Sequence, residues 1–320
     1  MNLRTFCKNS FQVSELGLGL SQLSQTKNTK HYGYKSEKEV FSIIEHAIKK
    51  KINFFDTSDG YGDTEKILGM LKKKQKEKIV ISTKAGRKTD GSRCFDKKYL
   101  ETQLDKSLKN LKMEKIDVFM LNKPSYETIV KENLLSFLEE LKRKGKIRYS
   151  GIVIGNKKNF DKIIKNRKID CFSVLFNILN TDDIDLLKLI AKHDKGLIVR
   201  SPLNSGILAG NINKKTKFNS FDERSRYFFG KNFEKKILKT EYLKKELRIK
   251  EKNLLKFSLD FILSYKFIST VLVGCSSMKQ LKNIVAYQSK TKYLNKKKHL
   301  KTLKLSYNLS KKYKTNNQLI

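Results

Sequence analysis

The chain of 320 residues has few cysteines, no tryptophan and no long apolar run. Its cysteines, Cys7, Cys94, Cys171 and Cys275, are widely spaced, and without a C-x-x-C pair we expect neither a metal site nor a redox pair. Scattered thiols are typical of a reducing cytosol, so a cytoplasmic protein is expected. No run approaches about 18 consecutive apolar residues, and the start, "MNLRTFCKNSFQ", is too polar for a signal peptide. We therefore predict no association with a membrane.

Arginine is also scarce, although the formal net charge is +38. The chain has ten arginines against sixty lysines, and the lysines are spread along its whole length. Arginine supplies the bidentate contacts that read guanine and hold phosphates, so this composition is poorly suited to specific nucleic-acid recognition. We interpret the charge as a solvated basic surface that adheres weakly to polyanions. A dedicated nucleic-acid face is the alternative.

The common glycine-rich motifs of nucleotide-binding proteins are missing as well. "GLGLSQ" has two of the three glycines of G-x-G-x-x-G, and no G-x-x-x-x-G-K-[ST] occurs. What the chain has is a regular alternation of short apolar runs with stretches of helical period. The runs lie at 13–20, 52–56, 78–84, 116–122, 147–154, 170–177, 197–203 and 269–274. Eight such units predict an α/β fold, a single-domain (β/α)8 TIM barrel, with an open doubly wound sheet as the alternative.

Two segments depart from this alternation. The connection from Gly210 to about Lys250 is far longer than a usual βα loop and follows the seventh strand, on the face where barrel active sites lie. It is either a lid or cofactor clasp, or a surface excursion without function. The segment 289–320 is rich in lysine and predicts a C-terminal helical tail with a frayed end. We thus expect one domain, 1–320, that carries a lysine-rich C-terminal extension.

Four polar residues lie at or just after the ends of predicted strands: Asp56, Tyr61, Lys84 and Asn122. In a barrel, the ends of neighbouring parallel strands meet at one rim. A lysine beside a tyrosine favours the phenolate, because a positive charge depresses the pKa of a nearby acid, and this helps the tyrosine to exchange a proton. Each residue taken alone has a structural explanation, such as a turn or a surface lysine. Together they predict an acid/base unit suited to carbonyl reduction.

The same segments resemble the aldo-keto reductase superfamily over nearly the whole chain. "INFFDTSDGYGDTEKILG" is similar to the family signature, "ISTKAG" to the strand that supplies its lysine, and "IDVFMLNKP" to the strand that ends at its fourth catalytic position. "SPLNSGILAGN" resembles the loop that clasps the cofactor, and "VLVGCSSMKQLKNIV" the segment that grips the adenosine phosphate. The resemblance implies a barrel that binds NADPH, less often NADH, and reduces an aldehyde, ketone or sugar-derived carbonyl to an alcohol.

The resemblance also implies roles for individual residues. Tyr61 would be the general acid that protonates the carbonyl oxygen of the substrate. Lys84, paired with Asp56, would adjust the pKa of Tyr61. The expected cofactor contacts are Asn177, Arg200, Ser201, Pro202, Leu203, Gly206, Leu208, Gly274, Ser276, Ser277 and Gln280. Lys279 or Lys282 would face a 2′-phosphate. The expected partner is a small carbonyl substrate, and the expected state is a monomer or a weak oligomer.

Several positions depart from the family pattern. The fourth catalytic position, usually histidine, is Asn122, which can donate a hydrogen bond but cannot relay a proton. Residues that often hold the nicotinamide carboxamide align with Val153 and Ile154, and a stacking aromatic aligns with Arg200. Because an oxidised nicotinamide is cationic, an arginine beside it should favour the reduced cofactor. An alternative function follows: a catalytically weak, cofactor-binding barrel with a regulatory role.

Overall fold

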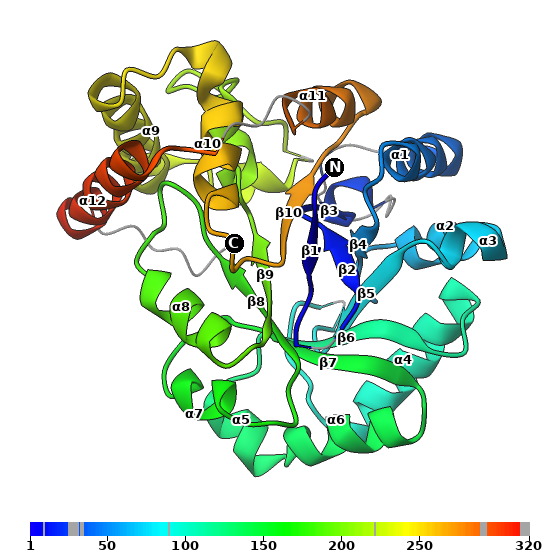
Figure 1. Cartoon of the computed structure of the whole chain (residues 1–320). Coiled ribbons are helices and arrows are strands. Elements are labelled where there is room, and N and C mark those ends of the chain that lie inside the picture. The colour runs from blue at the N-terminus through cyan, green and yellow to red at the C-terminus, as the bar shows by residue number, and fades with distance from the viewer. Residues whose placement is uncertain are drawn as a thin grey trace.

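A closed barrel of eight parallel strands forms the centre of the protein, and helices surround it (Figure 1). The computed structural model describes residues 1–8, 10–24, 32, 35–88, 90–220, 222–288 and 293–313. The strands are β3 (Leu16–Gly19), β4 (Phe54–Asp56), β5 (Val80–Ala85), β6 (Ile116–Asn122), β7 (Ile147–Val153), β8 (Cys171–Leu175), β9 (Gly196–Arg200) and β10 (Thr270–Gly274). The last strand, β10, pairs with the first, β3, and this closure confirms the predicted (β/α)8 barrel over the open sheet.

Helices connect successive strands, as the sequence pattern predicts. They are α1 (Glu37–Lys49), α2 (Thr64–Gly69), α3 (Lys73–Lys76), α4 (Lys97–Leu111), α5 (Tyr126–Lys131), α6 (Leu134–Arg143), α7 (Phe160–Ile164), α8 (Ile184–Lys192) and α10 (Leu254–Leu263). The helix α11 (Met278–Gln288) follows the last strand. Their starts follow from local chemistry. Ser36 and Glu39 form a reciprocal capping box at α1, and the side chain of Asp96 caps α4 by accepting from the backbone N–H of Tyr99.

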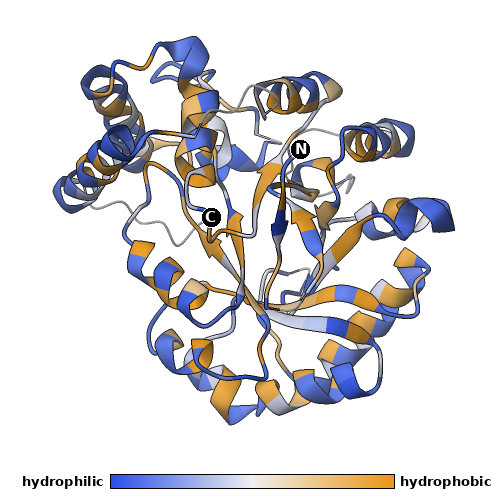
Figure 2. Cartoon of the chain, in the orientation of Figure 1, coloured by the Kyte–Doolittle hydropathy of each residue, from blue (hydrophilic) through white to orange (hydrophobic). Residues whose placement is uncertain are grey.

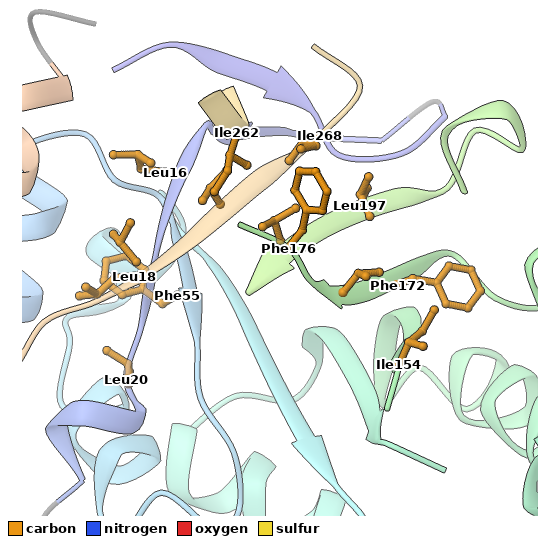
Figure 3. Packing of buried hydrophobic residues seen from close by; sticks show 14 of the residues in the cluster. Leu16, Leu18, Leu20, Phe55, Ile154, Phe172, Phe176, Leu197, Ile262 and Ile268 are labelled. Atoms are coloured by element: carbon orange, nitrogen blue, oxygen red, sulfur yellow. The ribbon is translucent and has the colours of Figure 1, made fainter. Parts of the chain in front are cut away.

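The helices bury one apolar face against the outside of the barrel, and Figure 2 shows hydrophobic and hydrophilic residues alternating along them. On α4, Leu100, Leu104 and Leu111 are fully buried at helical spacing. Figure 3 shows other members of the same cluster, among them Leu18 of β3, Phe172 of β8 and Ile262 of α10. This outer layer of apolar contacts holds the helices on the sheet.

The N-terminal end of the barrel is closed by a hairpin of β1 (Leu3–Thr5) and β2 (Gln12–Ser14). Phe6 and Val13 of this segment belong to the apolar cluster that fills the inside of the barrel, and the ring of Phe6 stacks on Phe54 with 5.7 Å between centroids. Because apolar side chains plug this end, polar chemistry is left to the opposite rim, where the strands end.

The long connection after β9 is more ordered than the sequence suggests. After a 3-10 helix, η2 (Asn204–Ala209), it contains a second short helix, η3 (Glu223–Arg226), then the 17-residue helix α9 (Gly230–Glu246) and η4 (Glu251–Asn253). The sequence pattern does not predict α9, because lysines separate its few buried apolar residues, Phe233, Ile237 and Leu243. The connection is therefore long, as predicted, and it contains a 17-residue helix.

The predicted C-terminal helical tail is α12 (Lys296–Lys312), which lies beside α9 (Figure 1). Ser306 of this helix donates to the carbonyl oxygen of Ile178 at 2.6 Å and lies 2.9 Å from the hydroxyl of Thr181. These buried contacts fix α12 to the loop that follows β8. The predicted frayed end, residues 314–320, lies outside the described residues.

In the described ranges, no helix has both the length and the apolar character that a membrane crossing requires.

Candidate active site

A buried ion pair lies at the rim where β4 and β5 end. The Nζ atom of Lys84 donates to Oδ2 of Asp56 at 2.6 Å and to the carbonyl oxygen of Thr57 at 2.7 Å. The other carboxylate oxygen of Asp56 accepts from the hydroxyl of Ser82 at 3.2 Å. Both charged side chains are only 7% exposed. Hydrogen bonds therefore compensate two buried charges, the condition under which such a pair is tolerated.

Tyr61 lies over this pair. Its ring centroid is 4.8 Å from Nζ of Lys84. Backbone hydrogen bonds hold the turn that carries Tyr61 against β5. The N–H of Thr57 donates to the carbonyl oxygen of Ser82 at 2.8 Å, and the N–H of Asp59 donates to the carbonyl oxygen of Lys84 at 3.3 Å. Burial acts to lower the pKa of Lys84, but the charges of Asp56 and Tyr61 outweigh it, and the pKa is raised. Lys84 is thus a fixed cation beside the tyrosine at neutral pH.

Asn122 ends β6 at the same rim. Lys84 pairs with Met120 in the parallel register, so Asn122 lies two residues farther toward the strand end. Its side chain is partly exposed, and its carbonyl oxygen accepts a hydrogen bond from the guanidinium of Arg93. The structure therefore brings Asp56, Lys84 and Tyr61 into contact, and places Asn122 on the next strand of the rim.

The predicted cofactor residues of β8 and β9 form a tightly turned loop at the rim. Asn177 is fully buried, and its Nδ2 donates to the carbonyl oxygen of Ser201 at 2.9 Å. Three consecutive residues, Asn204, Ser205 and Gly206, have left-handed backbone with φ of 46°, 54° and 102°. Successive N–H groups in unusual backbone conformations of this kind can form a concave surface that suits anions. In this loop, however, the N–H groups of Asn204 and Gly206 already donate to the carbonyl oxygens of Ser201 at 3.1 Å and Leu203 at 2.9 Å.

The other predicted cofactor contacts in this loop differ in how far they are exposed to solvent. Leu208 is fully buried and Pro202 is buried, so these two predicted contacts present little surface to a ligand. Leu203 is partly exposed. Arg200 is also partly exposed, and its Nη2 donates to the carbonyl oxygen of Ile154 at 3.3 Å.

The remaining predicted contacts lie between β10 and α11. The backbone N–H of Ser276 donates to Oε1 of Gln280 at 2.8 Å, and the hydroxyl of Ser277 accepts from the backbone N–H of Gln280 at 3.3 Å. These hydrogen bonds lie at the start of an 11-residue helix, α11. The N-terminus of a helix favours the binding of phosphate groups. Lys279 and Lys282 are exposed on its first two turns.

Comparison with known proteins identifies the chain. A model of the aldo/keto reductase family matches residues 15–300. The chain belongs to the aldo/keto reductase family. It is therefore an NAD(P)H-dependent oxidoreductase.

Aldo/keto reductase relatives match nearly the full length of the chain. It is 28% identical over 292 residues to an uncharacterized oxidoreductase, YqkF, of Bacillus subtilis, covering 88% of this chain and 89% of that protein. It is 27% identical over 299 residues to L-galactose dehydrogenase of Arabidopsis thaliana, covering 89% and 88%. The holo form of aldo-keto reductase AKR11C1 from Bacillus halodurans has the same fold, with a TM-score of 0.77, 24% identity and coverage of 95% and 96%.

Several rim residues of this aldo/keto reductase were not predicted from the sequence. Gln22 follows β3, and its Oε1 is buried with no hydrogen-bond partner among the described residues. Its amide occupies the place that a Cβ atom at Gly274 would take. Asp59, two residues before Tyr61, has a pKa raised to about 6, mainly by burial. Lys123 follows Asn122 directly. Adjacency to a predicted strand end is the signal that could have found all three.

Proposed function

We propose that the chain reduces a small carbonyl compound to an alcohol with NADPH, and that Tyr61 is the general acid. The observation that carries this proposal is the contact of Tyr61 with the buried pair of Lys84 and Asp56. A tyrosine held against a fixed cation at a barrel rim can give up a proton during the reaction. No metal is part of the proposal, and across the described ranges no three histidine, cysteine or acidic side chains are arranged to hold one.

The proton moves along a short path in this proposal. Tyr61 Oη donates it to the carbonyl oxygen as negative charge develops there. Lys84 stabilises the phenolate that remains, and the buried carboxylate of Asp56 holds the ammonium group in place through the 2.6 Å bond. When bound, the nicotinamide cofactor supplies the hydride to the carbonyl carbon.

The chain has groups suited to each part of that cofactor. Ser201, Pro202, Leu203, Gly206 and Leu208 would line the pyrophosphate through the left-handed loop. The remaining predicted contacts are Asn177, Arg200, Gly274, Ser276, Ser277 and Gln280. The buried amide oxygen of Gln22 has no hydrogen-bond donor among the described residues. A ribose hydroxyl could donate a hydrogen bond to it.

The choice of NADPH over NADH rests on lysine positions. Lys279 and Lys282 are exposed at the start of α11, where either could pair with a 2′-phosphate. NADH is the alternative. An NADH-specific methylglyoxal reductase of Escherichia coli, 27% identical over 257 residues (73% of this chain and 78% of that protein), is one relative. The positive charge of Arg200 disfavours a cationic ring beside it, so the chain should prefer reduced cofactor.

Asn122 supports a second candidate function. Its amide can donate a hydrogen bond to the substrate oxygen, but it cannot carry a proton. A barrel that binds cofactor, turns over slowly and regulates a partner would fit this substitution for histidine. The variant Asn122→His separates the two proposals. A large rise in turnover would favour the weak, regulatory barrel, whereas unchanged turnover would mean that asparagine suits the enzyme's own chemistry.

The direct experiment is NADPH oxidation with a broad panel of aldehydes, ketones and sugars. Turnover of at least one carbonyl is expected. If NADPH binds, as judged by its fluorescence, but no carbonyl in the panel is reduced, the proposed reductase activity is wrong. A cytoplasmic location, a monomeric or weakly oligomeric state and the lack of a specific nucleic-acid partner stay predictions from the sequence.

A further inference from the structure

Two arginines lie in a hairpin that follows β5 and folds over the end of β6. Arg87 and Arg93 face each other across an antiparallel bridge, and the backbone N–H of Lys88 donates to Ser92 at 2.9 Å inside the turn. The guanidinium of Arg93 donates to the carbonyl oxygen of Asn122. This bond ties the hairpin to the catalytic rim, although neither arginine has a role in the proposed proton transfer.

Lys123 brings a third positive charge to the same place. It has left-handed backbone, with φ of 61°, which turns the chain at the end of β6. Its stem lies along Gly155, where an added Cβ would be 3.0 Å from Cβ of Lys123 and 3.2 Å from its Cγ. A larger residue at Gly155 would therefore displace the lysine. Burial, together with the positive charges of Arg200, Arg93 and Arg87, lowers the pKa of Lys123 to about 7.

Arg200 joins this group to the catalytic residues. Its guanidinium bonds the carbonyl oxygen of Ile154, the residue before Gly155. Burial lowers its pKa to about 10, while the nearby Tyr61 and Asp56 act in the opposite direction. We name Arg87, Arg93, Lys123 and Arg200 the cationic rim. It extends from the catalytic tyrosine outward across the ends of β5, β6 and β9.

Nearby acids have partners of their own. Asp56 is paired with Lys84, and Asp183, which acts on Arg200, forms an ion pair with Lys157. Asp90, in the same hairpin as the two arginines, accepts from the hydroxyl of Ser92 at 2.6 Å. Three arginines thus lie close enough to lower the pKa of Lys123, and several positive charges gathered at one place attract an anion.

We propose that the cationic rim binds an anionic group, a phosphate or a carboxylate, on the carbonyl substrate. This inference rests on the proposed reductase function and names the substrate class of that site. The guanidinium forks match the geometry of carboxylate and phosphate oxygens. An anion held there, several bonds from the carbonyl, would direct the carbonyl oxygen toward Tyr61. Such contacts are the same in the ground and transition states, so they act mainly on KM.

Matched pairs of aldehydes test the proposal. One pair is glyceraldehyde 3-phosphate and glyceraldehyde, and the other is succinic semialdehyde and butanal, so the two pairs distinguish phosphate from carboxylate. We expect the anionic member of at least one pair to have a kcat/KM about tenfold to a hundredfold higher, the effect of one charge-assisted hydrogen bond. Added salt should reduce the difference in kcat/KM between the anionic and the neutral aldehyde, because it screens the charges.

Variants locate the effect. Lys123→Gln and Arg93→Gln should each lower kcat/KM for the preferred anionic aldehyde by about tenfold or more, chiefly through KM, and lower it far less for the neutral partner. Lys106→Gln makes the same change of charge at an exposed position of α4, outside the site, and should leave the anionic-to-neutral ratio unchanged.

Two results would overturn the proposal. Equal kcat/KM within both pairs would do so, as would variants that slow the anionic and neutral aldehydes by the same factor. If no member of either pair is reduced, the reductase function is judged separately by the broad carbonyl panel, and the rim is tested by titrating the NADPH-loaded protein with glycerol 3-phosphate. Binding that weakens in Lys123→Gln but not in Lys106→Gln supports the rim. No binding to the wild-type protein contradicts it.

Discussion

Replacing Lys84 with methionine would remove one partner of the buried ion pair and leave the other in place. The carboxylate of Asp56 would keep the hydroxyl of Ser82 as a donor but lose the ammonium group 2.6 Å away. Both charged side chains are 7% exposed, so solvent offers little compensation. Breaking a buried pair in this way typically costs about 3–5 kcal/mol, and we expect Lys84→Met to lower the free energy of unfolding by that amount.

The double variant separates stability from chemistry. Asp56→Asn combined with Lys84→Met removes both charges, and the new amide can still accept from Ser82. Most of the lost stability should return, because replacing both members of a buried pair is often nearly neutral. Carbonyl reduction should stay absent in both variants, because the cation beside Tyr61 is missing.

Reversible urea unfolding at neutral pH, with NADPH oxidation measured on the same samples, provides the assay. Lys106→Met, at an exposed position of α4, is the matched control and should stay within about 0.5 kcal/mol of the wild type. The reasoning is refuted if Lys84→Met costs less than about 1 kcal/mol, or if the double variant recovers stability and activity together.

Three further predictions concern a glycine and two titrating groups. Gly151→Ala would put a Cβ 2.5 Å from Sγ of Cys171 and 2.8 Å from Cγ of Met120, so thermal unfolding should show a loss of about 1–3 kcal/mol; an unchanged melting temperature would contradict this packing. The pKa of Asp59 is raised from 3.8 to about 6, so the fold loses stability as the pH rises through this range, and Asp59→Asn should gain about 1–2 kcal/mol at pH 8 but nothing near pH 3 in chemical unfolding. Because the pKa of Lys123 is about 7, the KM for succinic semialdehyde should rise as the pH increases from 6 to 8, and Lys123→Gln should remove that rise.

The barrel could be predicted because its signals are local and repeated. The apolar run of β6, for example, ends at Asn122 both in the sequence and in the structure. Once the strands are placed, the rim follows, because the ends of parallel strands in a barrel lie on one side. The order of the strands alone therefore predicts that Asp56 and Lys84 lie close together. The resemblance to the family signature predicts that Tyr61 joins them.

Other features depend on packing between distant segments, which no local pattern encodes. The helix α9 packs against η2 and α12, which are distant in the sequence, and its lysines obscure the helical period. The amide of Gln22 lies against Gly274, 252 positions away in the chain, and only the closure of β3 on β10 makes them neighbours. The cationic rim requires a hairpin, the left-handed turn at Lys123 and the end of β9 to meet, and charge spacing along the chain does not predict that meeting.

The central claim is that Tyr61 donates the proton in a cofactor-dependent carbonyl reduction. The most direct measurement is the rate of NADPH oxidation by Tyr61→Phe with the best aldehyde of the panel, alongside the change in NADPH fluorescence on binding. Loss of the hydroxyl should lower turnover by about 10²–10⁴-fold, the usual contribution of a general acid, while cofactor affinity stays close to that of the wild type. Turnover within a few fold of the wild type would contradict the account.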